Sequence, residues 1–465
     1  MRTAVPYIGT GIINDPIHGY IRYTRPRPGE SDPTERDLID HPWVQRMRFI
    51  SQLQSARWVY PAAEHSRFQH LLGAMAVASA VAQQIAPTLQ KVCTDAPSVG
   101  LLDALLRTTA LLHDVGHGPF SHFFDENYLK CVGLTHEAIS AHVVRDELAE
   151  LIRGLRRTPH ATLEPGEVLK PEWVAYLILK GKEDVPVPSW VRFLTPIFGG
   201  IYTADNMDYV LRDSYMTGVK IGPVDIDRLI FHTFFTSSGL TLHRSGLQAL
   251  FMFLSARIYL YQNVYYHRMA RAIDIQMREI FPRTVQRMLP SNPFEDLDQY
   301  RELTDWSFFE TVRRWRLSHD PEERELGNAW QAILNREVEW KPAFEMTLTL
   351  ASAQHLAQAD LNEATLEDMI RAELPVGWRD LDFRLDLAAK DARPLNPIQM
   401  GRIQIFVYDP VLDRVDAEPL HHLLEWLPAR VVQVRVFTRR GKGASVVGEA
   451  LTRVLRSLGV PAMRS

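Results

Sequence analysis

An apolar run that ends in a His-Asp pair constrains this chain more than any other stretch. Residues 101–112 predict a buried helix, which delivers His113 and Asp114 at its end. A Gly-x-Gly-Pro break follows and frees His117 and His122 to turn back toward the same place. Because adjacent residues on a helix diverge by about 100°, His113 and Asp114 can share one ion only if it sits over the helix end.

Composition bounds the class of protein. The chain has 465 residues, of which 46% are hydrophobic and 23% are charged. This length predicts roughly two to three domains, and the composition is that of a globular protein. The net charge is -4 and the pI is about 6.5. No overall basic field therefore indicates a nucleic-acid partner.

Cysteine usage and hydropathy point to a cellular location. The two cysteines, Cys93 and Cys131, are too few for a disulfide framework or a thiolate zinc site. No basic segment followed by an apolar stretch opens the chain, and no window reaches the roughly 18 uninterrupted apolar residues of a membrane span. We therefore expect a soluble, cytoplasmic protein without a membrane partner.

Helical periodicity dominates the first part of the chain. A short hairpin at residues 11–21 comes first, and Thr135 is placed to cap the helix that opens with His136. Helices are predicted at residues 35–53, 65–85, 201–215 and 247–281. The last of these is the longest, and Pro282 ends it.

The pattern changes near residue 340. Residues 343–350, 382–387, 402–408 and 430–438 alternate or are β-branched, which predicts strands, and residues 419–426 and 444–458 predict helices packed on them. The sequence therefore predicts a mainly α fold, with a helical core at residues 1–340 and a small α+β lobe at residues 341–465.

Four side chains make up a predicted metal site. His113 and Asp114 are joined by His70, at the start of another predicted helix, and by Asp205. Two imidazoles and two carboxylates suit Mn²⁺, Fe²⁺, Co²⁺ or Zn²⁺, with positions open for water and a substrate oxygen. Alternatively, His70 is only a polar helix start and Asp205 a surface acid. Beside the His-Asp pair and its glycine break, the metal site is favoured.

A second group consists of His117, His122 and His136, with Asp125 close to His122 in the sequence. Imidazoles near a metal can act as a general acid, donate hydrogen bonds to a phosphate, or bind a second ion. A single additional histidine is more often a structural residue, and this alternative applies most to His136.

Two arginines stand in apolar or catalytic surroundings and require anionic partners. Arg67 lies one turn before His70, and Arg257 interrupts an otherwise apolar helix face. A polyphosphate is one candidate partner. An internal carboxylate such as Asp208 or Asp213 is the other.

An aromatic stripe follows Arg257 on the same predicted helix. Tyr261 and Tyr265 are spaced by four residues and therefore share a face. These rings can pack on a sugar or a base, but such a stripe is more often simply part of the core.

The same stretches are similar to those of a known family. The sequence resembles the HD-domain deoxynucleoside triphosphate (dNTP) triphosphohydrolases, in particular the SAM-and-HD-domain dNTPase and its bacterial relatives. We expect no SAM domain, since the resemblance begins almost at Met1. It covers nearly the whole chain in order and rests on residues 14–19, 45–50, 65–70, 113–122, 135–137, 208–213 and 256–268.

The resemblance implies an HD-domain helical core and a role for each matched residue. The metal ligands would be His70, His113, Asp114 and Asp205. The catalytic histidine cluster and its supporting acid would be His117, His122, His136 and Asp125. Phosphate contacts would be Arg67, Tyr209 and Arg257, and sugar and base contacts would be Gln52, Leu53, Asp213 and Tyr265.

The implied reaction cleaves a dNTP between the 5′-oxygen and the α-phosphorus and releases the deoxynucleoside and intact triphosphate. The implied cofactor is Mn, Fe, Zn or Co, with Mg²⁺ accompanying the substrate phosphates. Two positions differ from the family. Asn206 replaces a lysine that reaches the phosphates, and Tyr261 replaces a histidine of the SAM-containing member. These differences bear on triphosphate affinity and on the fit around the base or sugar.

Regulation is implied by the same resemblance. The SAM-containing member binds guanine nucleotides between subunits, which assembles the active oligomer. We therefore expect a homo-oligomer, dimer or tetramer, with GTP or a dNTP as activator. Arg336 and Lys341 stand where a partner subunit would supply basic side chains, but their spacing is one residue longer than the family's. The remaining predicted effector residues are Asn14, His18, Asp40, Gln45 and Arg48. The alternative is that Asp40 and Arg48 are ordinary surface charges on a helix.

Two other functions compete with this interpretation. One is a different HD phosphohydrolase, acting on a nucleotide monophosphate, a cyclic dinucleotide or a nucleic-acid end. The other is a nucleotide-sensing scaffold with an idle site, against which the intact ligand set argues. Product analysis with a panel of nucleotides separates these functions.

Overall fold

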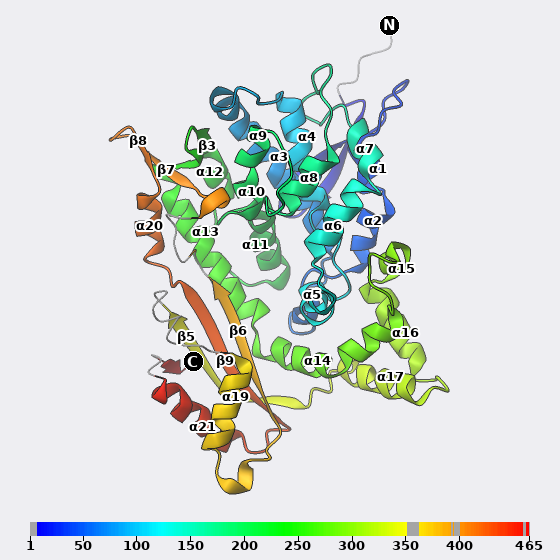
Figure 1. Cartoon of the computed structure of the whole chain (residues 1–465), viewed down its shortest axis with the longest axis vertical. Helices are drawn as coiled ribbons and strands as arrows, with labels where there is room; N and C mark the ends of the chain where they lie inside the picture. The colour runs from blue at the N-terminus through cyan, green and yellow to red at the C-terminus, as the bar shows by residue number, and fades with distance from the viewer. Residues whose placement is uncertain (1–6, 351–361, 392–393, 395–399, 459–461, 465) are drawn as a thin grey trace.

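The computed structural model describes residues 7–350, 362–391, 394, 400–458 and 462–464. Helices hold 54% of the residues and strands 14%, so the prediction of a mainly α chain is confirmed. In Figure 1 most helices occupy the upper and right-hand parts of the molecule, and strands β5, β6 and β9 lie at the lower left with helices α19 and α21.

Two long helices, α3 (Arg67–Val92) and α4 (Val99–Leu112), pack together at the centre of the core. Helix α11 (Ala204–Thr217) packs on α3. The two come unusually close at Gly73, where an added Cβ would lie 1.9 Å from an oxygen of Asp208. This close approach carries the carboxylates of α11 to the start of α3.

Helix α3 is also long and apolar enough to cross a membrane, judged by length and composition alone. However, 67% of its apolar window is buried inside the protein, and its first turn holds the buried side chains of Arg67 and His70. The helix is therefore a core element.

The predicted N-terminal hairpin is confirmed as strands β1 (Thr10–Asp15) and β2 (Gly19–Thr24). The single helix predicted at residues 35–53 is wrong. Helix α1 (Glu35–Ile39) ends at Ile39, with Asp40 as its C-cap. Pro42 begins α2 (Pro42–Gln45), which His41 caps. Two 3₁₀ turns, Arg46–Phe49 and Gln54–Trp58, follow. Proline is favoured at the first position of a helix, so it starts a new element here.

The long helix predicted at residues 247–281 is wrong in two respects. Helix α13 (Leu247–Leu260) passes into a π-helical turn, Tyr261–Tyr265, and α14 (Arg268–Met288) begins only after His267. Helix α14 then continues through Pro282, since Phe281 and Val285 beside it are completely buried. Core packing thus outweighs the hydrogen bond that proline removes.

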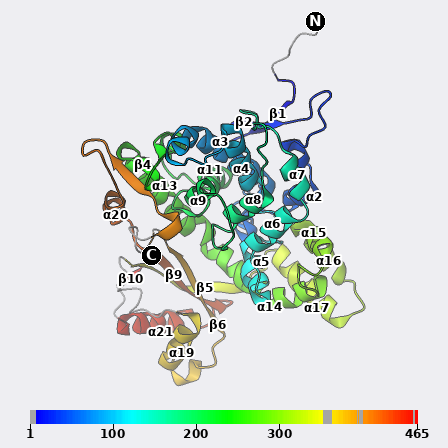
Figure 2. The same ribbon diagram turned by 45° about the horizontal axis from the view of Figure 1, so that its top comes forward.

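The C-terminal sheet has the order β10-β5-β9-β6, and its neighbours are antiparallel. Helices α19 (Glu363–Glu373) and α21 (Ala444–Ser457) cover one face of it (Figures 1 and 2). The strands are β5 (Trp340–Leu350), β6 (Phe383–Asp391), β9 (Arg430–Arg439) and β10 (Ala462–Arg464).

One predicted strand of the lobe lies elsewhere. The strand predicted at residues 402–408 begins only at Phe406, as β7 (Phe406–Asp409), and pairs in parallel with β4 of the helical core. The second four-stranded sheet has the order β3-β4-β7-β8, and α20 (Glu418–Leu424) packs on β7. Its other strands are β3 (Thr233–Thr236), β4 (Gly239–His243) and β8 (Arg414–Asp416). A domain boundary at residue 340 stays a prediction.

The remaining helices complete the core around α3 and α4. The helix predicted after Thr135 is confirmed as α6, and the Thr135 hydroxyl accepts a hydrogen bond from the Ala138 amide at 3.2 Å. Helix α6 spans His136–Arg145. The other helices are α5 (His122–Asn127), α7 (Ala149–Gly154), α8 (Pro171–Ile178), α9 (Ser189–Phe193), α10 (Thr195–Gly199), α12 (Ile226–Phe231), α15 (Leu297–Glu302), α16 (Asp305–Trp315) and α17 (Pro321–Leu334).

Candidate active site and metal centre

The structure brings the four predicted metal ligands together. Asp205, from the first turn of α11, places its Oδ1 3.2 Å from Nε2 of His70 and 3.7 Å from Nε2 of His113. Oδ1 of Asp114 lies 3.3 Å from the same nitrogen of His113. Three helices, α3, α4 and α11, thus deliver two imidazoles and two carboxylates to one point.

Unpartnered nitrogen atoms show that this group fits a divalent cation. The Nε2 atoms of His70 and His113 are buried without a hydrogen-bond partner in the described structure. Their Nδ1 atoms are held, by Asp208 Oδ2 at 2.8 Å and by the Ala110 carbonyl at 2.8 Å respectively. Fixing one imidazole nitrogen and leaving the other free is the usual arrangement of a metal-binding histidine. The residues present could therefore hold a divalent metal.

Asp208 anchors the metal site from behind. Besides His70, its carboxylate accepts hydrogen bonds from Arg212, at 2.9 Å from Nε and 2.8 Å from Nη2. His18 also faces it, with 2.7 Å between Nε2 and Oδ1. Asp208 was not predicted to hold His70, although it lies three residues after Asp205 on the same helix and therefore on the same face. The effector role predicted for His18 stays a prediction; its side chain points to this buried network.

The carboxylates around the metal site raise the pKa values of its two histidines. Burial alone would lower the pKa of His70, but the carboxylates of Asp205 and Asp208 raise it to about 10. Burial likewise lowers the pKa of His113, and Asp114 and Asp205 more than offset this, so the net shift is upward. Without metal, the imidazolium of His70 therefore balances the acids around it.

We expect metal binding to release protons. A liganding imidazole must be neutral, and a group with a pKa of about 10 is protonated at neutral pH. Metal affinity should therefore rise with pH, and about one to two protons should leave per Mn²⁺ near pH 7.5. Calorimetric titration in buffers of different ionisation enthalpy measures this number, with His319→Ala as the exposed-histidine control. The same enthalpy in every buffer would contradict a protonated His70.

The second histidine group converges on one carboxylate. Oδ2 of Asp125 lies 2.7 Å from Nδ1 of His136, 3.2 Å from Nδ1 of His122 and 3.3 Å from Nδ1 of His117. Burial would raise the pKa of Asp125, but His117 and His136 hold it well below the usual range. The carboxylate is therefore ionised and hydrogen-bonds to the rings of His122 and His136, whereas Nδ1 of His117 faces it without a hydrogen bond in the described structure.

The two groups meet at Asp114. Its Oδ1 lies 3.5 Å from Nε2 of His117 and 3.7 Å from Nε2 of His136, and these two rings stack with centroids 3.7 Å apart. In the described part of the chain, donor atoms of His117, His122, Asp125 and His136 lie within 4.8 Å of one another, so a second ion stays an alternative to proton transfer. His122 is the exposed member, with 65% of its side chain accessible.

A strained loop positions this group. Phe120 and Ser121 both have left-handed backbone conformations, with φ of 60° and 55°, which cost energy for residues with side chains. The ring of Phe120 is buried against Phe308 and Trp330, at centroid distances of 5.1 and 5.8 Å. Its amide donates to Oδ1 of Asp305 at 2.8 Å. Aromatic packing and this hydrogen bond thus hold the turn that presents His122.

A cavity of about 380 Å³ is lined by Arg67, which pairs with Asp114, and by Tyr209, which follows Asp205 by one helical turn. The four metal ligands themselves are not part of its wall. Six of the seven predicted substrate residues line it, together with His122. The seventh, Arg257, is not part of its wall and donates from Nη1 to the Ile201 carbonyl at 3.1 Å. A phosphate contact from Arg257 stays a prediction. The six lining residues are Gln52, Leu53, Arg67, Tyr209, Asp213 and Tyr265.

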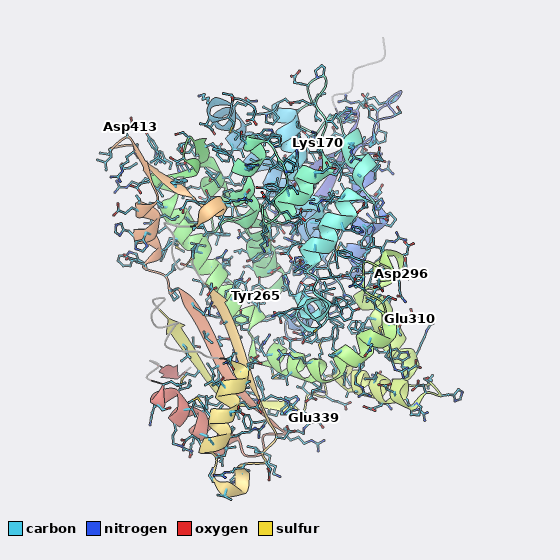
Figure 3. The ribbon with its side chains drawn as sticks, in the orientation of Figure 1. Lys170, Tyr265, Asp296, Glu310, Glu339 and Asp413 are labelled. Atoms are coloured by element: carbon cyan, nitrogen blue, oxygen red, sulfur yellow. The ribbon has the colours of Figure 1, made fainter. Side chains whose placement is uncertain are left out.

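One wall of the cavity is suited to hydroxyl groups. The Tyr265 hydroxyl donates to Oδ2 of Asp213 at 2.5 Å, and His65 holds the other carboxylate oxygen at 2.9 Å. Burial and the Asp213 charge raise the pKa of Tyr265 well above its usual range, so its phenol stays neutral. Oε1 of Gln52 is buried without a partner in the described structure and can accept a further hydrogen bond. Figure 3 shows Tyr265 between the core helices and the C-terminal strands.

Arg67 and Asn206 both have partners within the protein. Arg67 forms an ion pair with Asp114, and its Nε donates to the Ser121 hydroxyl at 2.7 Å. An internal carboxylate is therefore its partner, although it is neither of the two considered from the sequence. Asn206 completes the capping box of α11, where its Oδ1 accepts from the Thr203 amide at 2.6 Å. Its side chain is thus used locally and does not line the cavity.

Most of the predicted effector residues make contacts within the chain. Asp40 pairs with Arg36 at 3.0 Å, while Gln45 accepts from Arg48 at 2.8 Å. Asn14 is exposed on the hairpin. Arg336 and Lys341 line a different cavity of about 510 Å³ that contains none of these residues. An effector site and the oligomer stay predictions.

Comparison with known proteins settles the family. Residues 67–172 match the model of the HD domain, and residues 224–372 match that of the HD associated region. The chain is an HD-domain protein. His70, His113, Asp114 and the histidine cluster fall inside the first match, whereas Asp205 lies between the two.

The relatives include dNTP triphosphohydrolases. The chain is 24% identical over 459 residues to the deoxynucleoside triphosphate triphosphohydrolase SAMHD1 homolog of Dictyostelium discoideum, a match that covers 96% of this chain and 80% of that one. It is 27% identical over 339 residues to human SAMHD1, covering 65% of this chain and 50% of the human one. The HD match and these relatives support a metal-dependent phosphohydrolase.

Two further matches concern proteins without a described activity. An uncharacterized protein of Methanocaldococcus jannaschii is 32% identical over 279 residues, and the match spans 59% of this chain and only half of that protein. The crystal structure of a hypothetical protein from Aquifex aeolicus matches with a TM-score of 0.67 and 23% identity, covering 95% of this chain and all of that one. The second match shows the fold.

Proposed function

We propose that this HD-domain protein hydrolyses dNTPs to the deoxynucleoside and inorganic triphosphate. The observation that carries the proposal is the cavity, whose wall contains His122, the Asp213–Tyr265 pair and Arg67, the ion-pair partner of Asp114. One member of the histidine group, the partner of a metal ligand and a hydrogen-bonding carboxylate thus face one cavity. This combination suits a phosphorylated sugar.

The cavity walls suggest how such a substrate binds. Arg67 and Tyr209 line the part next to the metal ligands and would contact phosphate oxygens. The neutral phenol of Tyr265 and the carboxylate of Asp213 would hold the sugar, and Gln52 offers its unpartnered oxygen to a hydroxyl group. Leu53 provides an apolar surface for a base or sugar face.

Different residues of the chain have different roles in the proposed hydrolysis. When bound, the divalent cation supplies positive charge that polarises the phosphate and acidifies water. His122 lines the cavity and is held at Nδ1 by Asp125, so it is the better placed of the two candidate donors to protonate the leaving 5′-oxygen. His136 is the alternative donor, and Asp125 orients both rings.

Analysis of the products tests the proposal. With Mn²⁺ and each dNTP in turn, chromatography should resolve the deoxynucleoside and inorganic triphosphate, and a dNMP should be a poor substrate because it lacks the outer phosphates. A chelator should stop the reaction. Pyrophosphate plus dNMP would show a different point of attack, and turnover of a monophosphate or cyclic dinucleotide instead would favour another HD phosphohydrolase. Full-strength nucleotide binding without metal and without turnover would favour the scaffold.

A further inference from the structure

Part of the cavity wall comes from outside both regions that match known families. Strand β6 of the C-terminal sheet contributes Ala389 and Lys390 to the lining, and these residues follow the end of the second match at residue 372. Two contacts fix β6 on the helical core. The Tyr266 hydroxyl donates to the Ala389 carbonyl at 2.7 Å, and Arg271 pairs with Asp386 at 2.6 Å.

The cationic side chains of this wall differ in how far their charge is neutralised. Arg67 is paired with Asp114. Arg271 is paired with Asp386 and lies 3.3 Å from Asp274. Among the described residues, the ammonium of Lys390 has no carboxylate within ion-pair distance; it lies 4.3 Å from the centroid of the Tyr261 ring. Of these three lining cations, Lys390 therefore carries the charge available for a ligand.

The position of Lys390 relates it to the phosphate end of the cavity. The ring of Tyr261, over which the ammonium lies, is 4.8 Å from the ring of Tyr265 between centroids, and the Tyr265 ring is 6.5 Å from that of Tyr209. Tyr209 follows the metal ligand Asp205 by one turn of α11 and lines the cavity together with Lys390. The Lys390 side chain is half-buried, and the contact given for its ammonium among the described residues is with an aromatic face. Such a contact is weaker than a charge-assisted hydrogen bond to a phosphate, and the flexible stem of lysine lets the ammonium move to one.

We propose that Lys390 is a substrate-binding residue that contacts the outer phosphates of a triphosphate. The proposal rests on the function proposed above and deepens it, since it makes the C-terminal sheet part of the active site. The ligand class is a polyphosphate anion. The competing explanation is that Lys390 only braces Tyr261.

The experiment uses the full chain loaded with Mn²⁺ and inorganic tripolyphosphate as the probe. Lys390→Gln removes the charge and Lys390→Arg keeps it. The matched control is Lys442→Gln, which removes the same charge from an exposed turn after β9. Calorimetry gives the tripolyphosphate affinity, steady-state kinetics give KM and kcat for a dNTP, and thermal melting reports folding.

We expect Lys390→Gln to weaken tripolyphosphate binding and raise KM by about tenfold each, with kcat nearly unchanged. Lys390→Arg should restore most of the affinity, and Lys442→Gln should change neither. Unchanged tripolyphosphate affinity in Lys390→Gln would overturn the proposal, whether or not its melting temperature or kcat fell. If Lys390 governs tripolyphosphate binding but the wild type hydrolyses no dNTP, the proposed function fails and the polyphosphate contact stands.

Discussion

Replacing Asp205 by alanine should remove tightly bound metal and lower dNTP turnover by at least about 100-fold. Its Oδ1 lies within 3.7 Å of the Nε2 atoms of both liganding histidines, so the variant loses an anionic ligand from the middle of the set. Metal content by elemental analysis and dNTP hydrolysis by chromatography are the two measurements. The variant should also melt at a lower temperature, because His70 and His113 stay buried with fewer partners.

A matched substitution separates this effect from a general loss of acidic charge. Asp298→Ala removes a carboxylate that is 83% exposed and paired only with Arg301 on the surface. It should keep both metal and activity. Wild-type turnover in Asp205→Ala would contradict the assignment of the metal site. Normal metal content with lost turnover would show that Asp205 contacts the substrate and does not bind the metal.

Elements with strong local signals were predictable from the sequence. The apolar run before His113 and Asp114, the Thr135 cap and the hairpin at residues 11–21 all depend on neighbouring residues, and the structure confirms each of them. The helix errors also have local causes. Pro42 starts a helix where continuation was expected, and the π-turn at residues 261–265 contains no proline or glycine that would mark it in the sequence.

The parts of the site that were missed depend on contacts between distant segments. His18 and Asp208 are 190 residues apart in sequence, and only the close packing of α11 on α3 at Gly73 makes their network with His70 visible. Lys390 reaches the cavity because β6 pairs with β9 and docks on α14. Neither periodicity nor spacing encodes such pairings, whereas Asp205 was a candidate from the sequence because it completes a donor set with His70, His113 and Asp114.

The other large effect is expected for Asp125→Asn, which should lower kcat by about 10²- to 10³-fold and leave the KM for dNTP nearly unchanged. One carboxylate oxygen of Asp125 faces Nδ1 of His117, His122 and His136 at 2.7 to 3.3 Å. An amide offers one acceptor oxygen and no charge, and its NH₂ group would face an imidazole N–H. The rings would lose the orientation that proton donation to the 5′-oxygen requires.

Metal analysis gives this variant a second readout. Asp125 is not in the set with His70 and His113, so the bound ion should be retained if the histidine group transfers protons. Asp146→Asn is the control, because Asp146 faces His142 at 2.8 Å in a His-Asp pair that is not part of the cavity wall. The kcat of this control variant should equal that of the wild type. A kcat within a few-fold of wild type would exclude the Asp125 group from proton transfer. Loss of one of two ions in Asp125→Asn would instead show that His117, His122 and His136 hold a second metal.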